Sequence, residues 1–500
     1  MTSVTPRLMA ALAHWAQTKP AAFACIDDHS RWQWDAFHAC VRDTAAALRQ
    51  VVADSADGGA DTSPVVGILM DNGADFAIAA CSVAAIGATF TLFPADMAAE
   101  ATRRLMRQSG VRVVITDEPN SANLPKHGVV GVTLQQLKGR DRTGEAPSFE
   151  ADPLAFSIVY SSGTTGNPKA IVHPRSARAA IDEAARRLGV DAGAVNLVAL
   201  PMFNNLALVT WLPALVNGGC NVILKSFSPR AFAEAVEAHA VTHFVLSPRQ
   251  YRELLASNEL GGHRLDSLKL HISSSSRLGA AEKAAITSRL PGRFCEIYGV
   301  TEGGVGTLLQ VSEGAKLNTV GKPMPSYEMT IIDEQGREAP AGQIGYIAGH
   351  SAFMMSRYQD PGHVARYWAR AAAPERRFFV PGDLGFFDED GYLTVLDRAV
   401  DTVQLGGQRW FPSVIEDDLL ASGGCAELAV SFGPAGQAPG SLTVRWVGND
   451  DDEQPLRQAL ASKYPNFVPV LVRCRNLPRN AMGKLLRTEL GATPAKATHD

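Results

Sequence analysis

The sequence lacks the cysteine patterns of disulfide-stapled and zinc-binding proteins. It has seven cysteines in 500 residues, an odd number, and no two of them form a CxxC pair. A disulfide framework uses cysteines in pairs, and a zinc ribbon uses closely spaced ligands. We therefore expect reduced, mostly buried thiols in a cytoplasmic protein. The cysteines are Cys25, Cys40, Cys81, Cys220, Cys295, Cys425 and Cys474.

The sequence also lacks an excess of charge of either sign. Lysine and arginine total 47 and aspartate and glutamate 51, which gives a formal net charge of −4. This balance argues against a nucleic-acid coat protein and a polybasic membrane binder, although a local basic groove stays compatible with it. Hydrophobic residues make up 46% and charged residues 20%, a balance typical of globular proteins. A chain of this length exceeds one compact core, so we expect two or three lobes.

A secretory signal and a membrane span are not expected either. The first apolar run is short and has no small-residue cleavage pattern behind it. One longer run, Phe76–Ala95, has 20 residues without a charge, which is enough to cross a bilayer. It is rich in alanine, interrupted by Gly87 and closed by Pro94. A helix over 75–86 followed by a strand over 88–93 explains it better.

Through most of the chain, short β-rich runs alternate with amphipathic helical windows. This alternation predicts βαβ units and parallel sheets. Helical windows include Ala177–Leu188 and Ala231–His239. Buried strands are predicted at Val65–Leu69, Val113–Thr116, Ile158–Tyr160, Asn196–Leu200, Asn221–Leu224 and His243–Leu246.

The pattern changes from about Gly321 onward. Shorter strands separated by turns, as at Glu328–Asp333, Gly345–Ala348 and Gly391–Leu396, predict an antiparallel or barrel-like lobe. After Arg398 a new unit of helices and strands begins, and we place a boundary near 397–402. The fold expected is α/β: a large N-terminal domain over 1–397, with parallel α/β sheets and a barrel-like lobe, and a small α+β C-terminal domain over 398–500.

The strongest local signal is the segment from Tyr160 to Lys169, YSSGTTGNPK, which follows an apolar strand. Its glycines let backbone amides turn inward, its serines and threonines add hydroxyl donors, and Lys169 adds a compact cation suited to a polyphosphate. It is not the nucleotide P-loop GxxxxGK(S/T), because the last glycine lies three residues before the lysine and Pro168 has no N–H. Taken alone, the segment is either a phosphate-binding loop or a flexible surface loop.

Together with four further segments, this loop resembles the motifs of the adenylate-forming superfamily, which includes acyl-CoA synthetases, carrier-protein adenylation domains and luciferases. Their order and spacing match over nearly the whole chain, which excludes the surface-loop interpretation. The four segments are YGVTE at 298–302, PGDLG at 381–385, GGQRWFPSVIE at 406–416 and PRNAMGKLLR at 478–487.

The resemblance implies an enzyme that joins a carboxylate to the α-phosphate of ATP, expels pyrophosphate and passes the acyl group to a thiol. Such a site must hold a polyanion, neutralise charge growing on the transferring phosphorus and position the acid. The implied cofactors are ATP, Mg²⁺ and coenzyme A (CoA), or the phosphopantetheine arm of an acyl carrier protein. The implied substrate is a small-molecule carboxylic acid.

The resemblance also implies a role for each motif residue. The residues expected at the β- and γ-phosphates are Ser161, Ser162, Gly163, Thr164, Thr165, Gly166 and Lys169. Thr301 is expected at the α-phosphate, Glu302 at Mg²⁺, Tyr298 and Gly299 at adenine, Asp383 at the ribose hydroxyls, and Arg398 at the ribose or phosphate. Lys484 is expected to be the catalytic electrophile, since a fixed cation aimed at developing charge is typically worth ~10²–10³ in rate.

In this superfamily the C-terminal domain rotates between the two half-reactions. Here the pivot falls at Val400 or Asp401. The rotation withdraws Lys484 and brings in Gly406 and Gly407, small residues that suit a pantetheine arm passing close to the backbone.

The sequence departs from the family pattern at three places, two at the substrate side of the site and one at the hinge. Asn204 stands where many CoA ligases have a histidine, which puts a gating role for an aromatic ring there in doubt. Ser274 and Ser275 replace glycines beside the acyl pocket and add bulk and hydroxyl groups. Val400 replaces a charged hinge residue. We therefore expect a small, aromatic or polar acid rather than a long alkyl chain.

Several alternatives remain open at this point. WFPSVIE at 410–416 is closer to the CoA-ligase form of its loop, which favours CoA as the acceptor. A freestanding enzyme that loads a separate carrier protein is the second hypothesis. A homologue that binds nucleotide without turnover is the third, and the intact Lys169, Glu302, Asp383 and Lys484 argue against it. The sequence leaves the oligomeric state open between monomer and homodimer.

Overall fold

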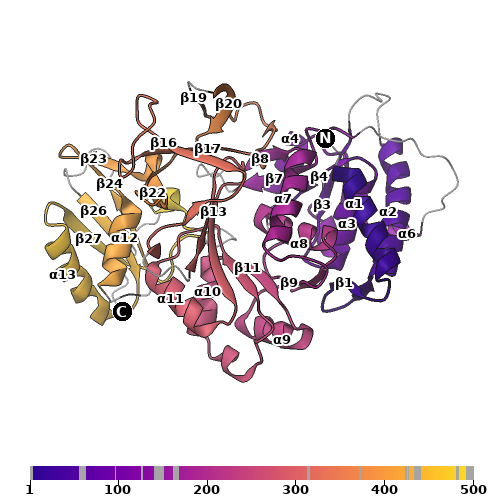
Figure 1. The fold of residues 1–500 in the computed structure, drawn as a ribbon, viewed down its shortest axis with the longest axis horizontal. Coiled ribbons are helices and arrows are strands. Elements are labelled where there is room, and N and C mark those ends of the chain that lie inside the picture. Colours follow the sequence, from indigo (N-terminus) through magenta and orange to yellow (C-terminus); the bar gives the residue numbers. More distant parts are fainter. Residues whose placement is uncertain are drawn as a thin grey trace.

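The structure is a computed structural model of the 500-residue chain. It describes residues 4–55, 63–95, 97–125, 128–139, 151–161, 168–311, 316–370, 373–422, 425, 427–432, 441–479 and 484–490. Figure 1 shows the N-terminal elements in indigo at one end of the molecule and the C-terminal elements in orange and yellow at the other.

The N-terminal end contains a seven-stranded sheet of mainly parallel strands. Its strands are nearly all apolar and buried, as expected for a parallel sheet covered on both faces. The pairs from β7 through β4, β3 and β5 to β6 are parallel, and β8 and β18 add an antiparallel edge. The order is β18 (Arg357–Tyr358), β8 (Lys169–His173), β7 (Ser157–Ser161), β4 (Thr89–Leu92), β3 (Val65–Leu69), β5 (Val113–Thr116) and β6 (Val130–Val132).

A nine-stranded sheet lies beside it. Its six central strands, from β13 to β1, are parallel, and antiparallel strands close both edges. The order is β15 (Lys322–Pro323), β14 (Gly306–Gln310), β13 (Arg293–Gly299), β12 (Leu270–Ser273), β11 (His243–Leu246), β9 (Val195–Val198), β10 (Cys220–Ile223), β1 (Phe23–Ile26) and β2 (Arg31–Gln33).

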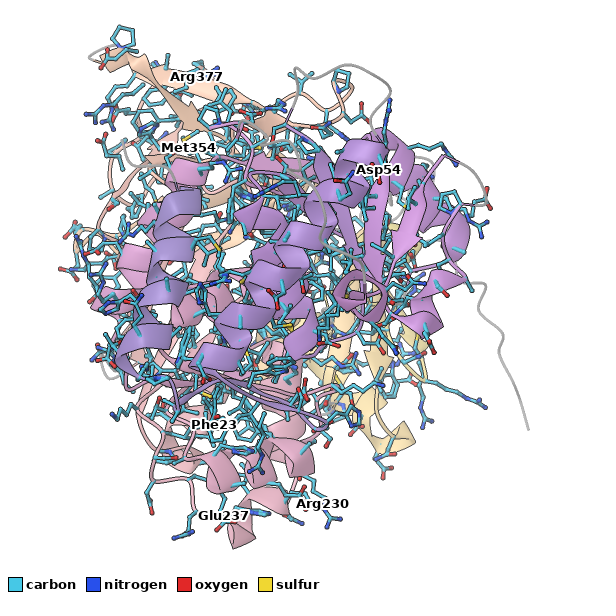
Figure 2. All side chains as sticks on the ribbon, turned by 90° about the vertical axis from the view of Figure 1, so that its right-hand side faces the viewer. Phe23, Asp54, Arg230, Glu237, Met354 and Arg377 are labelled. Carbon is cyan, nitrogen blue, oxygen red and sulfur yellow. The ribbon has the colours of Figure 1, made fainter. Side chains whose placement is uncertain are left out.

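Helices cover these two sheets. In Figure 2, Asp54 at the end of α2 lies near the top of the helical layer, and Arg230 and Glu237 of α9 lie at the opposite, lower end. The helices are α1 (Val4–Thr18), α2 (Trp34–Asp54), α3 (Ala74–Ala85), α4 (Ala99–Gln108), α5 (Glu118–Ser121), α6 (Leu134–Lys138), α7 (Arg175–Arg187), α8 (Asn205–Val216), α9 (Pro229–His239), α10 (Pro248–Ala256) and α11 (Ala280–Arg289).

The predicted antiparallel lobe is present as a six-stranded sheet. All of its pairs are antiparallel, and β16 branches off the path by pairing with β17. The path runs through β19 (Tyr367–Arg370), β20 (Ala373–Phe379), β17 (Gly345–Ser351), β21 (Asp383–Phe387) and β22 (Leu393–Arg398), with β16 at Tyr327–Ile332.

The elements after β22 have a hydrophobic core of their own. Trp446 is buried at its centre among leucines and valines. This separate core fits a boundary near 397–402, which stays a prediction. The elements are the hairpin β23 (Val403–Leu405) and β24 (Gln408–Trp410), α12 (Pro412–Ala421), α13 (Glu453–Lys463), and the sheet of β25 (Glu427–Phe432), β26 (Ser441–Val447) and β27 (Val468–Arg473).

The long uncharged run forms a helix and a strand, as predicted. Residues Phe76–Ala95 contribute to α3 and β4, and most of them are buried in the largest core cluster. In the described parts of the chain, every helix is too short or too polar to span a bilayer. All seven cysteines lie in described segments, none of them forms a disulfide bond, and four of them are buried.

Candidate active site

A cavity of about 990 Å³ lies where the two large sheets meet the antiparallel sheet. The carboxyl ends of β7, β12 and β13 open onto it, which is where ligands bind in parallel α/β sheets. Of the residues singled out in the sequence, those that line it are Ser161, Lys169, Asn204, Ser274, Ser275, Tyr298, Gly299, Thr301, Glu302, Arg398 and Lys484.

The hairpin of β7 and β8 carries the predicted phosphate loop. Ser161, the last residue of β7, is paired with Lys169, the first residue of β8, so both ends of the loop are fixed at the cavity. The intervening candidates Ser162, Gly163, Thr164, Thr165 and Gly166 lie outside the described residues.

Glu302 is oriented by a tyrosine from a distant part of the chain. The hydroxyl of Tyr358 donates to Glu302 Oε1 at 2.7 Å, and Lys169 Nζ lies 5.3 Å from the centre of the same ring. Gly303 lets the backbone beside Glu302 pack closely against the segment that precedes Tyr358. Its φ is +82°, and a Cβ there would lie 2.1 Å from the carbonyl oxygen of Phe353. A carboxylate and an ammonium group therefore face the cavity from two sides of one aromatic ring.

Tyr298 and Arg398 hold Asp383 between them. The hydroxyl of Tyr298 donates to Asp383 Oδ2 at 2.7 Å, and Arg398 Nε lies 3.3 Å from Oδ1. Burial, together with the nearby Asp383 charge, raises the pKa of Tyr298 well above its usual value, so the phenol keeps its proton. Asp383 is itself buried and lies between these two donors.

Lys484 enters the cavity from the C-terminal unit. Burial, reinforced by the positive charge of Arg398, lowers the pKa of Lys484, whereas the charges of Asp383, Asp401 and Glu302 act in the opposite direction. These electrostatic neighbours place the ammonium group among residues from two other motifs, 298–302 and 381–385, and beside Arg398 and Asp401. A cation in this position can stabilise negative charge on a ligand that is bound between Glu302 and Asp383.

A two-pronged ion pair anchors the segment that carries Lys484. Arg487 Nη2 lies 2.7 Å from Glu416 Oε2 and Arg487 Nη1 lies 2.8 Å from Oε1. Arg487 also donates to the Ser413 hydroxyl at 2.9 Å. Since Ser413 and Glu416 lie on α12, this fork fixes the lysine segment to the helix that follows the GGQRW hairpin.

Thr301 is held through its backbone by a buried histidine. Arg178 donates to His173 Nδ1 at 3.1 Å, so Nε2 carries the proton and donates to the carbonyl oxygen of Thr301 at 2.7 Å. Burial lowers the pKa of His173 well below its usual value and keeps the imidazole neutral. This contact is structural support for the site.

The residues at the two substrate-pocket departures have distinct local roles. Asn204 is the N-cap of α8, since its side-chain oxygen accepts from the backbone N–H of Leu206 at 2.9 Å. Ser274 is buried beside the cavity. Ser275 lines the cavity with a φ of 91°, a left-handed conformation that favours glycine.

The predicted pantetheine glycines are not at the cavity. Gly406 and Gly407 form the turn of the β23–β24 hairpin with φ values of 62° and 79°, and nothing lies within 4 Å of a Cβ built at either. The proposed pivot lies in a short 3₁₀ turn, Ala399–Asp401, in which the Val400 side chain is 80% exposed.

Tyr358 was not among the predicted site residues. The segment that contains it, Gly345–Tyr358, matches the family pattern only weakly, and an isolated tyrosine at a strand end usually packs in the core. Its role comes from the antiparallel pairing of β18 with β8, which sets Tyr358 opposite Ile171 and beside Lys169.

The protein groups present suit a magnesium ion bound together with phosphates. In the described part of the chain, no three His, Cys, Asp or Glu side chains form a ready-made metal cage. Mg²⁺ in nucleotide sites is held by one or two carboxylates together with phosphate oxygens and water. Glu302, which lines the cavity and is held by Tyr358, fits that arrangement.

Comparison with known proteins gives consistent matches. A family model described as AMP-binding enzyme matches residues 12–359. A fatty acid–[acyl-carrier-protein] ligase, ScoC, from Streptomyces coeruleorubidus is 27% identical over 77% of this chain and 78% of its own. 4-Coumarate–CoA ligase 1 from Oryza sativa subsp. japonica is 25% identical over 90% of this chain and 85% of its own.

Solved structures share the fold over nearly the full length. O-succinylbenzoate coenzyme A synthetase (MenE) from Bacillus subtilis in complex with AMP superimposes with a TM-score of 0.81, at 23% identity, over 96% of this chain and 97% of its own. ATP-bound MatB from Rhodopseudomonas palustris gives a TM-score of 0.83, at 21% identity, over 98% of both chains.

Proposed function

The chain belongs to the family of AMP-binding enzymes and is an AMP-forming acid–thiol ligase, and we propose how its residues divide that work. The observation that carries the proposal is that Lys484, from the C-terminal unit, lines the same cavity as Lys169, Thr301 and Glu302. Two cations and a carboxylate around one cavity suit a polyphosphate and a metal ion.

In the first half-reaction ATP lies along the cavity. The loop from Ser161 to Lys169 holds the β- and γ-phosphates, and Thr301 contacts the α-phosphate. Tyr298 and Gly299 pack against adenine, Asp383 accepts from the ribose hydroxyls, and Arg398 donates on the same side. Glu302 holds Mg²⁺, which neutralises phosphate charge when bound.

The Lys484 ammonium group then serves as the electrophilic catalyst. A carboxylate oxygen of the acid attacks the α-phosphorus, and the bond from that phosphorus to the bridging oxygen of the β-phosphate breaks. Pyrophosphate leaves with the electron pair, and the product is an acyl-adenylate. The Lys484 ammonium group stabilises the charge that develops on the α-phosphate oxygens and orients the carboxylate.

In the second half-reaction the acyl group passes to a thiol. We propose two domains, 1–397 and 398–500, of which the second turns about Val400 or Asp401. The turn brings Gly406 and Gly407 to the pantetheine arm. The thiol sulfur attacks the acyl carbonyl carbon, the thiol proton is lost to solvent, and AMP leaves with the electrons of the C–O bond.

We propose CoA as the acceptor and a small, aromatic or polar acid as the substrate. The CoA-ligase form of the 410–416 segment and the two serines at the cavity support this choice. A carrier-protein phosphopantetheine arm is the second candidate, because one relative is named as an acyl-carrier-protein ligase. The seven cysteines, none of which forms a disulfide bond, support a cytoplasmic location.

The test measures each half-reaction separately. Acid-dependent release of pyrophosphate is screened over small and long-chain acids, and the active acids are then offered CoA or holo carrier protein. Lys484→Ala is expected to abolish acyl-adenylate formation and to spare thioester formation from supplied acyl-adenylate. Lys463→Ala, an exposed lysine on α13 whose Nζ donates to the Asp418 carbonyl at 2.9 Å, is the control. Equal loss of both half-reactions in Lys484→Ala contradicts the division of roles.

A further inference from the structure

Arg178 is a buried arginine on the wall of the cavity with one unused donor group. It lies on α7, and 2% of its surface is exposed. Its Nη2 donates to Ser157 Oγ at 3.0 Å, to His173 Nδ1 at 3.1 Å and to Asn205 Oδ1 at 3.0 Å. Its Nη1 is buried and has no hydrogen-bond partner among the described residues.

The guanidinium of Arg178 makes no direct ion pair with a described carboxylate. Its three partners are a hydroxyl, a neutral imidazole and a carboxamide, and no described carboxylate lies within 4 Å of the guanidinium. Asp182, one turn further along α7, contributes only at longer range, and burial raises its pKa to about 7. Burial lowers the pKa of Arg178 to about 9, so the guanidinium stays protonated at neutral pH.

An unpaired charge and an unused donor are both costly inside a protein. A buried donor without an acceptor costs roughly 1–3 kcal/mol, and more when it is charged. A buried donor of this kind is retained where a bound ligand supplies the missing acceptor. The ATP phosphates do not need it, because Lys169, Arg398 and Lys484 already face the cavity.

The residues around Arg178 indicate which kind of ligand group it can bind. Ile181 on the same helix, and Leu206 and Val209 on α8, line the cavity beside it. His173 separates the guanidinium from Thr301 by the width of one imidazole ring, so Arg178 lies beyond the α-phosphate position. A cation beyond the reaction centre, set among apolar side chains, matches an anionic group at the far end of a short apolar body.

We propose that Arg178 is a specificity residue that binds the second carboxylate of a dicarboxylic acid, whose first carboxylate is adenylated. The assignment rests on the proposed function and narrows its substrate class. The second carboxylate accepts from Nη1 and supplies the counter-charge that the protein itself omits. The corresponding monocarboxylic acid contacts the same apolar walls but cannot form this charge pair, so it binds less tightly.

The test compares acids that differ only in the far group. Succinic and adipic acids are paired with butyric and hexanoic acids, and terephthalic acid with 4-methylbenzoic acid, in the pyrophosphate-release assay on the full chain. The wild-type chain is expected to favour at least one diacid over its partner by ~10-fold or more in kcat/KM, because a site with an unpaired polar group rejects a ligand that leaves it unpaired. Arg178→Met is expected to abolish the preference, which is measured as the ratio of the diacid to the monoacid kcat/KM within the same variant.

Two further variants separate binding from folding. Arg178→Lys keeps the charge and is expected to retain part of the diacid preference. Arg175→Met is the matched control, because Arg175 is an equally buried arginine on α7 that donates to the backbone carbonyls of Asp152 and Gly87 instead of lining the cavity. It is expected to lower the unfolding temperature without changing the diacid-to-monoacid ratio.

Three results overturn the assignment: monoacids used as well as their diacid partners, a ratio unchanged in Arg178→Met, or a defect of that variant confined to thioester formation, which would assign Arg178 to the pantetheine arm. If no acid supports pyrophosphate release, the proposed function fails instead. In that case, the unfolding temperature of the wild-type chain is measured with AMP and each acid of a pair in turn. The assignment requires that the diacid raises this temperature and that its monoacid partner does not. Equal unfolding temperatures with the two acids also overturn the assignment.

Discussion

Arg277 of the nine-stranded-sheet region forms an ion pair with Asp417 of α12, across the junction between the two proposed domains. The same guanidinium donates to the backbone carbonyls of Val395 and Leu396 at 3.3 Å each, just before the proposed pivot. The ion pair with Asp417 joins α12 to the body while Lys484 is in the cavity. The proposed turn of the C-terminal unit would break this ion pair and leave the contacts with Val395 and Leu396 in place.

Arg277→Ala is therefore expected to weaken the orientation used for adenylation. A half-exposed ion pair is worth about 0.2–1 kcal/mol, so the single-turnover rate of acyl-adenylate formation should fall about 2- to 5-fold. Thioester formation from supplied acyl-adenylate should be unchanged or faster. Arg264→Ala is the control, because Arg264 pairs with Glu237 far from the pivot. A parallel loss in both half-reactions would show that Arg277 acts on stability alone.

Tyr358→Phe is expected to raise the Mg²⁺ concentration needed for half-maximal adenylation by about 10-fold or more, because a hydrogen bond to a charged group is worth about 1.5–3 kcal/mol. The change removes the donor 2.7 Å from Glu302 Oε1 and leaves the ring under Lys169. Magnesium titration of pyrophosphate release checks it. Tyr346→Phe, on the antiparallel sheet, should leave the titration unchanged. An unaltered Mg²⁺ requirement in Tyr358→Phe would mean that the phenol does not orient Glu302.

The sequence could predict the alternating α/β pattern, the change near Gly321 and the set of motif residues that meet at the cavity. These are carried by local periodicity and by ordered short segments. The contacts of Tyr358 with Glu302 and of Arg178 with His173 could not be predicted. Each depends on how separate strands and helices pack, and an isolated tyrosine or arginine gives no local sign of such a contact.

The conformation of Ser275 could not be predicted either, yet it makes the serine run testable. Ser275→Gly is expected to raise the free energy of unfolding by up to ~1 kcal/mol, because glycine adopts a φ of 91° without the strain of a Cβ. Ser275→Ala keeps the strain and should give no increase. Chemical denaturation of both variants checks this. If the hydroxyl contacts the acid, both variants lose activity equally, and a loss in one alone would exclude that contact.

The lowered pKa of Lys484 predicts a particular pH profile for adenylation. The lysine must be protonated to act as an electrophile, and its protonated fraction falls as pH rises through its pKa. Because burial and Arg398 lower that pKa, kcat/KM for acyl-adenylate formation should decline on the alkaline side at a pH below the ordinary lysine value of about 10.4. Lys484→Arg should retain reduced activity without this decline, since a guanidinium stays protonated. The same alkaline decline in the arginine variant would assign it to another group, and thioester formation from supplied acyl-adenylate should lack it in both proteins.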